Sequence, residues 1–340
     1  MKINKTELQL ALEKVKPGLA SKEVIEQSTS FAFMGNRVVT YNDEISISHP
    51  VKGLEVTGAV KAQALYSFLS KVKRNEIDVE WEEKQVVIKA GKSKAGLVFE
   101  QEVKLPVEEV GEIGKWKKLP AEILNALKFC YPCCSKDMSR PILTCVYVGE
   151  DSVQASDSYQ IVKYELEKKV PVKGFLLPAS STRELVKYDI KEIAEGQGWY
   201  HFKTDDGTIF SSRVFNGEFP DIERFLEFKG KEVSFPKTAI QALERARIFS
   251  KSDFNANNLE IVEVEVTEGQ IKFSAQDSSG WFEERIKTKY KGEKIKFTTS
   301  VEFLINLLSQ TPSCIYGEGR VKFSGEKWTH VVAVTAEEGE

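Results

Sequence analysis

Three segments of the sequence share one pattern, an amphipathic helix that ends near a Ser-Lys pair, and this repeat constrains the fold more than any other feature. The pairs begin at Ser21, Ser135 and Ser250, so the pattern returns after 114 and then 115 residues. The apolar positions with one-sided helical spacing are Leu8, Ala11, Leu12 and Val15, then Ile123, Ala126, Leu127 and Cys130, and more loosely Ile240, Leu243 and Ala246. A chain of 340 residues therefore holds three units of about 113 residues, each the size of an ordinary domain.

Each unit continues in the same order after its first helix, which Pro17 and Pro132 are expected to end in the first two units. Alternating strands lead to an acidic corner, and the corners are Asp43, Asp157 and Asp277. A second helix and further strands follow, and these helices are expected at residues 61–74, 178–189 and 300–311. Linkers are expected near residues 106–118 and 219–233, where Gly, Pro and acidic residues break the pattern. We expect an α+β fold whose repeated domains, at residues 1–113, 114–230 and 231–340, each pack two helices on antiparallel sheets.

The charges of the chain are distributed unevenly between helices and the rest. The composition, 41% hydrophobic and 29% charged, is typical of a soluble globular protein. No apolar run approaches the roughly 18 residues that span a bilayer, and no apolar signal segment follows the first lysines, so we expect a cytoplasmic protein without a membrane partner. The net charge is −3, yet the six predicted helical segments sum to +9 and leave −12 elsewhere. A basic helical face on an acidic body indicates one surface that attracts phosphates, although Lys and Arg also favour solvated helix faces in general.

Cysteines and histidines do not form a metal or catalytic pattern. The odd number of five cysteines indicates reduced thiols. Cys130, Cys133 and Cys134 have zinc-like spacing, but Cys145 is the next candidate ligand and stands alone, so we expect buried thiols and no metal site. The three histidines, His49, His201 and His330, lie far apart on strand-like stretches, and we expect structural roles for them.

The sequence also lacks the motifs of an enzyme. Gly91-Lys92-Ser93 lacks the glycine that a P-loop needs five residues earlier, where Val86 stands, and it lies in an expected hairpin. Adjacent acids such as Glu283 and Glu284 point to opposite faces of a strand and indicate solvated charge. No G-x-S-x-G, H-E-x-x-H or G-x-G-x-x-G occurs. We therefore expect no catalytic residues and no cofactor.

Over essentially its whole length the sequence resembles the bacterial-type DNA sliding clamps, the beta subunits of DNA polymerase III. The segments that carry the resemblance are Phe219-Pro220-Asp221-Ile222, Glu244-Arg245-Ala246-Arg247-Ile248-Phe249-Ser250, Gly91-Lys92-Ser93-Lys94 and Ala155-Ser156-Asp157. The resemblance implies a DNA clamp fold and a head-to-tail homodimer that forms a six-domain ring. It also implies a processivity factor that is not itself an enzyme, with double-stranded DNA bound without sequence preference, and with a DNA polymerase and a clamp loader as partners.

The resemblance assigns the basic residues to the surface that faces DNA, with Lys22 at a position where the family carries a DNA-contacting residue. The expected DNA-binding residues are Lys14, Lys16, Lys22, Lys71, Lys73, Arg74, Lys136, Arg140, Arg245, Arg247 and Lys251. The loop before Ile142 lacks the aromatic pair that some relatives carry. For ring closure, the resemblance places the first repeat of one copy against the third repeat of the other. The expected interface residues are Lys92, Lys94, Ala95, Ile248, Phe249, Glu283 and Glu284. Ala95 replaces the aromatic residue of the family, which suggests a looser ring.

The resemblance further implies a hydrophobic cleft for partner peptides between the second and third repeats. The expected cleft residues are Leu143, Ser156, Tyr159, Ile161, Pro220, Arg224, Phe225, Val331, Ala333 and Val334. The family ends in an apolar, Pro-containing tail, whereas this chain ends Thr335-Ala336-Glu337-Glu338-Gly339-Glu340, which suggests altered peptide selection and a phage or plasmid version. Ala95 and this tail also leave open an alternative: a clamp-like scaffold or decoy that binds polymerase or loader peptides without encircling DNA.

Overall fold

The computed structural model describes residues 1–111, 113–251 and 260–336. Helices occur at each of the six positions that the repeat predicts. They are α1 (Lys5–Val15), α2 (Ala62–Lys71), α3 (Ile123–Cys130), α4 (Ala179–Leu185), α6 (Thr238–Ala246) and α7 (Val301–Leu308), with a further short helix α5 (Glu223–Leu226) in the second expected linker. The expected α+β class is confirmed. No helix in these described ranges has the length and apolarity needed to cross a bilayer.

The ends of the first helices follow from local sequence. Asn4 caps α1, because its side-chain oxygen accepts hydrogen bonds from the backbone N–H groups of Thr6 (3.0 Å) and Glu7 (3.2 Å). Pro17 ends α1 as predicted, and the chain continues into a short 3-10 turn at Lys16–Gly18. Pro132 does the same for α3, in the turn Tyr131–Cys133. The helix expected at residues 178–189 is shorter, since α4 ends at Leu185.

The described residues group into two compact units, not three. The first unit contains residues 1–132, 145–151 and 166–218, and the second contains residues 133–144, 152–165 and 219–340 as far as they are described. The second expected domain contributes strands to both units. The division at residues 113 and 230 therefore stays a prediction.

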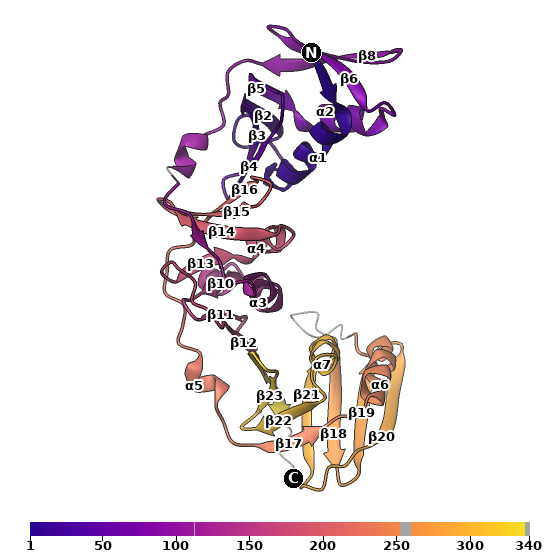
Figure 1. Ribbon diagram of the computed structural model, residues 1–340. Helices are drawn as coiled ribbons and strands as arrows, with labels where there is room; N and C mark the ends of the chain where they lie inside the picture. The colour runs from indigo at the N-terminus through magenta and orange to yellow at the C-terminus, as the bar shows by residue number, and fades with distance from the viewer. Residues whose placement is uncertain (112, 252–259, 337–340) are drawn as a thin grey trace. The chain divides into compact units, whose positions relative to one another are not determined.

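One antiparallel sheet runs through the first unit, with α1 and α2 packed beside each other (Figure 1). In sheet order its strands are β1 (Lys2–Asn4), β6 (Glu76–Trp81), β7 (Gln85–Ala90), β8 (Ser93–Glu100), β5 (Val56–Lys61), β2 (Ser30–Gly35), β3 (Arg37–Tyr41), β4 (Ile45–Pro50), β16 (Ile209–Arg213), β15 (Trp199–Thr204), β14 (Ile190–Glu195) and β9 (Lys117–Lys118). The first unit also contains β10 (Cys145–Val148), which pairs with β13 (Phe175–Pro178). The pairing of β4 with β16 makes residues of the first two expected repeats parts of one sheet.

The second unit contains two groups of antiparallel strands. One group, in order, is β11 (Ser152–Ser156), β12 (Gln160–Glu165), β24 (Trp328–Ala333), β23 (Arg320–Ser324), β22 (Ser313–Gly317) and β17 (Lys231–Ser234). The other is β20 (Gly280–Lys287), β19 (Gln270–Asp277), β18 (Ile261–Thr267), β21 (Ile295–Ser300) and β25 (Thr335–Ala336). Helices α6 and α7 pack on each other and on this second sheet (Figure 1). The core between them is apolar and fully buried, as at Phe273, Leu304 and Phe323.

The cysteines and histidines lie inside these units. All five cysteines are free thiols with buried side chains, as expected. Each histidine hydrogen-bonds a neighbouring side chain: His49 with Thr208 (2.8 Å), His201 with Ser211 (2.8 Å) and His330 with Gln160 (2.9 Å). Burial lowers the pKa of each ring to about 4, so the rings are neutral at pH 7. The described ranges contain no group of three or more His, Cys, Asp or Glu residues arranged for a metal ion.

Candidate nucleic-acid and peptide interfaces

Six of the eleven expected DNA-binding residues lie on, or follow, two helices of the first unit. The apolar faces of α1 and α2 are buried, at Leu8 and Leu12 and at Leu65 and Leu69, so their polar faces remain at the surface. Lys14 lies in the last turn of α1, and Lys71 in the last turn of α2, where a cation is favoured by the helix dipole. Lys16 and Lys22 follow α1, and Lys73 and Arg74 follow α2. The structure thus places this half of the predicted set at, or after, the C-terminal ends of two packed helices, and the segment that follows α2 lies beside the start of α1, where Asn75 accepts a hydrogen bond from the backbone N–H of Lys5 (2.7 Å).

The cations of the first unit differ in their partners. Lys14 forms an ion pair with Asp206, which lies in the turn between β15 and β16. The ammonium of Lys16 stacks over the ring of Tyr66, 4.5 Å from its centroid. Lys22 and Lys71 are exposed, and neither makes an ion pair with any residue in the described ranges. The local charge available to a phosphate is therefore smaller than the sequence suggests.

The second unit holds the rest of the predicted set, and two of its arginines are engaged by carboxylates. Arg245 on α6 makes a bidentate pair with Glu284, with distances of 2.8 and 2.7 Å. Arg247 pairs with Glu260. Arg140 instead donates a hydrogen bond to the hydroxyl of Ser158 (2.7 Å). The exposed Lys136 and Lys251 complete the predicted set on this unit.

The residues expected at the ring interface lie on or beside two edge strands, one in each unit, with Ile248 and Phe249 in a 3-10 turn after α6. Among the described strands of the first unit, β8 pairs with β7 from Ser93 to Val98 and with β5 only at Phe99 and Glu100, so its other edge is unpaired before Phe99. Lys92 and Lys94 are exposed at this edge. Ala95 is half-buried and lies opposite Ile88 of β7. Val98, which the sequence reasoning missed, exposes 69% of its surface.

In the second unit, β20 is an edge strand that pairs with β19 alone among the described strands. Side chains alternate along it: Phe282 stacks on Phe249 and Glu284 binds Arg245, both toward α6. Trp281 lies on the opposite face and exposes 71% of its surface, and Ile248 exposes 64%. Trp281 was also missed by the sequence reasoning. Glu283 is engaged within the chain by Arg285 (2.5 Å) and Lys272 (3.6 Å).

All the residues expected in the peptide cleft belong to the second unit. Ser156, Ile161 and Val331 lie directly opposite one another on β11, β12 and β24, so their side chains share one face of the sheet. The backbone N–H of Ala333 donates to the carbonyl of Tyr159 (2.7 Å). Tyr159 itself is 54% exposed. Leu143 is half-buried in a 3-10 turn at Pro141–Thr144, and Val334 is half-buried directly after β24 and Ala333.

The segment around α5 packs against β24 and supplies the other expected cleft residues. Pro220 precedes α5, and Arg224 lies on it with its guanidinium 4.6 Å from the ring of the neighbouring Phe225. Arg320 of β23, which the sequence reasoning missed, holds this segment. Its guanidinium donates to the carbonyl of Phe225 (3.3 Å) and stacks on the ring of Phe228 (4.8 Å). Arg320 thus links the α5 segment to β23, next to the strand β24 that carries Val331 and Ala333.

The last described residues pair with a different group of strands from the one that carries the expected cleft residues. The backbone N–H of Val334 donates to the carbonyl of Gly319 (2.9 Å). The chain then adds the short strand β25 to the edge of β21, with Thr335 opposite Thr298. The acidic residues of the tail, from Glu337 on, lie outside the described residues.

Comparison with known proteins identifies this architecture. No family model matches the sequence. The chain is 22% identical to the beta sliding clamp of Proteus mirabilis over 259 residues and 22% identical to that of Pseudomonas aeruginosa over 262 residues. These matches cover 69% and 73% of this chain, and they span only 66% and 69% of the two relatives.

Solved structures match along the full chain. The DNA polymerase III subunit beta from Pseudomonas aeruginosa superposes with a TM-score of 0.85 at 17% identity, over 99% of this chain and 100% of that one. The beta chain from Streptococcus pneumoniae gives 0.84 at 21% identity, over 99% of both chains. The chain has the sliding-clamp fold. The resemblance of the sequence to bacterial-type sliding clamps is thereby confirmed. A third match, at a TM-score of 0.86 and 15% identity over 99% of both chains, is the sliding clamp from Bartonella birtlesii bound to griselimycin.

Proposed function

We propose that this protein is a DNA sliding clamp, in which two copies close head to tail into a ring around duplex DNA and tether a DNA polymerase. The observation that carries the proposal is the similarity of the fold to DNA polymerase III beta subunits over 99% of the chain. In this proposal the domains at residues 1–113, 114–230 and 231–340 give six domains around the ring. The protein acts by topology and has no catalytic step of its own.

Ring closure by β8 of one copy and β20 of the other is supported by matching chemistry on both faces of the two strands. Lys94 and the exposed Val98 lie on the same face of β8, and Trp281 and Glu283 lie on the same face of β20, since every second side chain of a strand shares a face. On the other faces, Ala95 can meet Ile248 and Phe249. Such a contact is heterologous and closes after two copies.

Binding to DNA in this proposal is weak at each phosphate and independent of base sequence. Exposed lysines such as Lys22, Lys71 and Lys73 contact phosphates through long or water-mediated interactions. A ring held by topology needs no tight contact, because it can leave only when an interface opens or a DNA end arrives. Few free cations therefore favour sliding.

The cleft on the second unit is the proposed docking site for short apolar peptides of the polymerase and of the clamp loader. Ser156, Ile161 and Val331 form its floor, and Phe225 and Tyr159 form exposed apolar walls. A few such side chains usually provide most of the affinity for a peptide. Thr335 and Ala336 pair with β21 and not with the strands that carry the cleft residues.

A nicked circular plasmid tests the proposal directly. The protein is loaded with a clamp loader, unbound protein is removed, and the plasmid is then cut once. A ring is retained on the circle and lost after the cut. Protein that stays after the cut binds DNA by a groove. Protein that is never retained, but still binds polymerase peptides, fits the scaffold alternative; either result overturns the proposal.

A further inference from the structure

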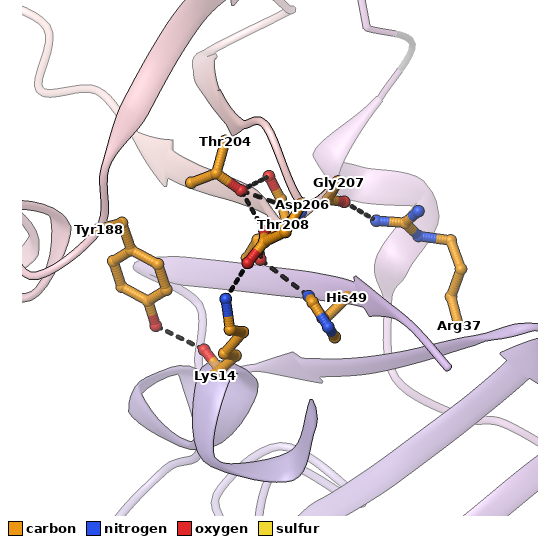
Figure 2. Close-up of polar contacts among 8 residues, drawn as sticks. All are labelled: Lys14, Arg37, His49, Tyr188, Thr204, Asp206, Gly207 and Thr208. Carbon is orange, nitrogen blue, oxygen red and sulfur yellow. Dashed lines mark hydrogen bonds and ion pairs between the residues drawn. The ribbon is translucent and has the colours of Figure 1, made fainter. Parts of the chain in front are cut away.

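The turn between β15 and β16 holds a carboxylate in a fixed position against α1, all within the first unit (Figure 2). One oxygen of Asp206, Oδ1, accepts hydrogen bonds from the hydroxyls of Thr204 (2.5 Å) and Thr208 (2.7 Å) and from the backbone N–H of Thr208 (3.2 Å). The other oxygen, Oδ2, accepts a hydrogen bond from the ammonium of Lys14. The hydrogen bonds within its own turn therefore orient the carboxylate independently of the lysine.

The turn itself is anchored to β3 and β4, the two strands on which α1 packs. Arg37 of β3 donates to the carbonyl of Gly207 (2.9 Å) and to the carbonyl of Ser48 (3.2 Å). Because the hydroxyl of Thr208 gives its proton to Asp206, the ring nitrogen of His49 at 2.8 Å must be the donor to Thr208. These contacts leave the position of Asp206 little freedom.

Lys14 is fixed at both ends. Its carbonyl accepts a hydrogen bond from the hydroxyl of Tyr188, and its ammonium is bound to Asp206 (Figure 2). The pair is partly exposed, with 39% of the Lys14 side chain and 44% of the Asp206 side chain accessible. An exposed ion pair of this kind contributes little to stability. Its main effect is on the charge that α1 presents to solvent.

We propose that Asp206 is an internal substitute for a DNA phosphate, which binds Lys14 and removes that cation from the DNA-facing surface. The inference rests on the proposed function, since it concerns the same surface. Three hydrogen bonds from Thr204 and Thr208 fix Oδ1 and leave Oδ2 to bind Lys14, as a phosphate oxygen would. Lys22 and Lys71, without such a partner in the described ranges, remain available to DNA. Asp206 thus sets the strength of nonspecific DNA binding and keeps it low enough for sliding.

The salt dependence of DNA binding measures the number of phosphates that are neutralised. Each additional phosphate contact steepens the slope of log K against log salt concentration by about 0.9. Freeing one lysine therefore increases the gain in affinity between 200 and 50 mM salt by a factor of about 3.5. This change is measurable by fluorescence anisotropy on a short duplex, which does not require ring loading.

The test compares Asp206→Asn with Asp205→Asn, which removes the same charge from the same turn without freeing Lys14. We expect Asp206→Asn to steepen the slope by about 0.9 relative to Asp205→Asn. We expect this difference to vanish when Lys14→Gln is present in both variants, as a double-mutant cycle requires. Equal slopes for Asp206→Asn and Asp205→Asn, or a difference that survives Lys14→Gln, would overturn the inference.

A second comparison keeps the inference testable should the β15–β16 turn not tolerate asparagine. Lys71→Gln is expected to reduce the slope by about 0.9, and Lys14→Gln by clearly less, because Asp206 already neutralises Lys14. Equal losses would contradict the inference. If the wild-type protein shows no salt-dependent DNA binding at all, the proposed function fails instead, and the two failures are distinct.

Discussion

Truncation of Trp281 should weaken the ring more than any other single change at the edge of β20. A tryptophan side chain can bury roughly 150–250 Å². Since 71% of Trp281 is exposed in one copy, on the order of 150 Å² is available to a second copy. At about 25 cal/mol per Å² the upper limit is about 4 kcal/mol, and a contact at the rim of an interface gives about half of that.

The ring contains this contact twice, so Trp281→Ala should cost the dimer about 4 kcal/mol, which is nearly a thousandfold in its dissociation constant. Sedimentation equilibrium over a concentration series measures the change. Leu10→Ala, which removes an exposed apolar side chain from α1, is the matched control and should leave the dimer constant unaltered. The thermal midpoint of both variants should stay near that of the wild type, because neither side chain is in the core. A dimer constant for Trp281→Ala within threefold of the wild type would refute the assignment of β20 to the interface.

Four further outcomes follow from the described contacts. If Ala95 loosens the ring, light scattering should show the wild-type dimer dissociating at low nanomolar concentration, and a dimer that persists there contradicts this prediction. The exposed Trp281 and Val98 would favour a persistent dimer if they are buried in the interface. Phe225→Ala should weaken binding of an apolar polymerase peptide at least about tenfold by calorimetry, whereas an unchanged affinity removes Phe225 from the cleft. Arg320→Met should weaken binding of the same peptide and increase hydrogen exchange in α5. Arg320→Lys should restore peptide binding and protection from exchange only in part, because lysine cannot both stack on Phe228 and donate to the carbonyl of Phe225. Equal behaviour of the two variants argues against a positioning role. Stability to urea should fall as the pH is lowered from 7 to 5. The imidazole of His330 takes up a proton near pH 6.5 in the unfolded chain, whereas burial lowers its pKa to about 4 in the folded protein. This histidine accounts for about 2 kcal/mol of that loss, and a pH dependence unaltered by His330→Gln contradicts the assignment.

The repeat predicted the helices well because their patterns are local. The spacing of apolar residues, the cap at Asn4 and the proline at position 17 all act within a few residues of each other. The length of α4 was predicted less well. The expected helix ran on through Tyr188, but this residue instead turns its hydroxyl to the carbonyl of Lys14. A contact 174 residues away in the chain leaves no trace in a local pattern.

The same reason explains what was missed in the candidate interfaces. The partners of the predicted DNA-binding cations are Asp206, Glu284 and Glu260, which become neighbours only through strand pairing and the β15–β16 turn. Net charge counted along helices therefore overstates the cations free to bind phosphate. The exposure of Trp281 could have been predicted from the sequence, because a large apolar side chain on the charged face of an alternating strand indicates a surface that binds another protein.

If topology holds the protein on DNA, it should have a long lifetime on closed circular DNA even in high salt. After loading onto the circle, the salt is raised from 0.1 to 1 M, where Lys and Arg contacts to phosphate are largely lost. Dissociation is then followed by gel filtration. The loaded protein should stay on the circle for as long as the ring interfaces stay closed, and it should leave a linear DNA of the same sequence at once. Equal and rapid loss from circular and linear DNA at high salt would show that charge alone holds the protein and that no ring surrounds the duplex.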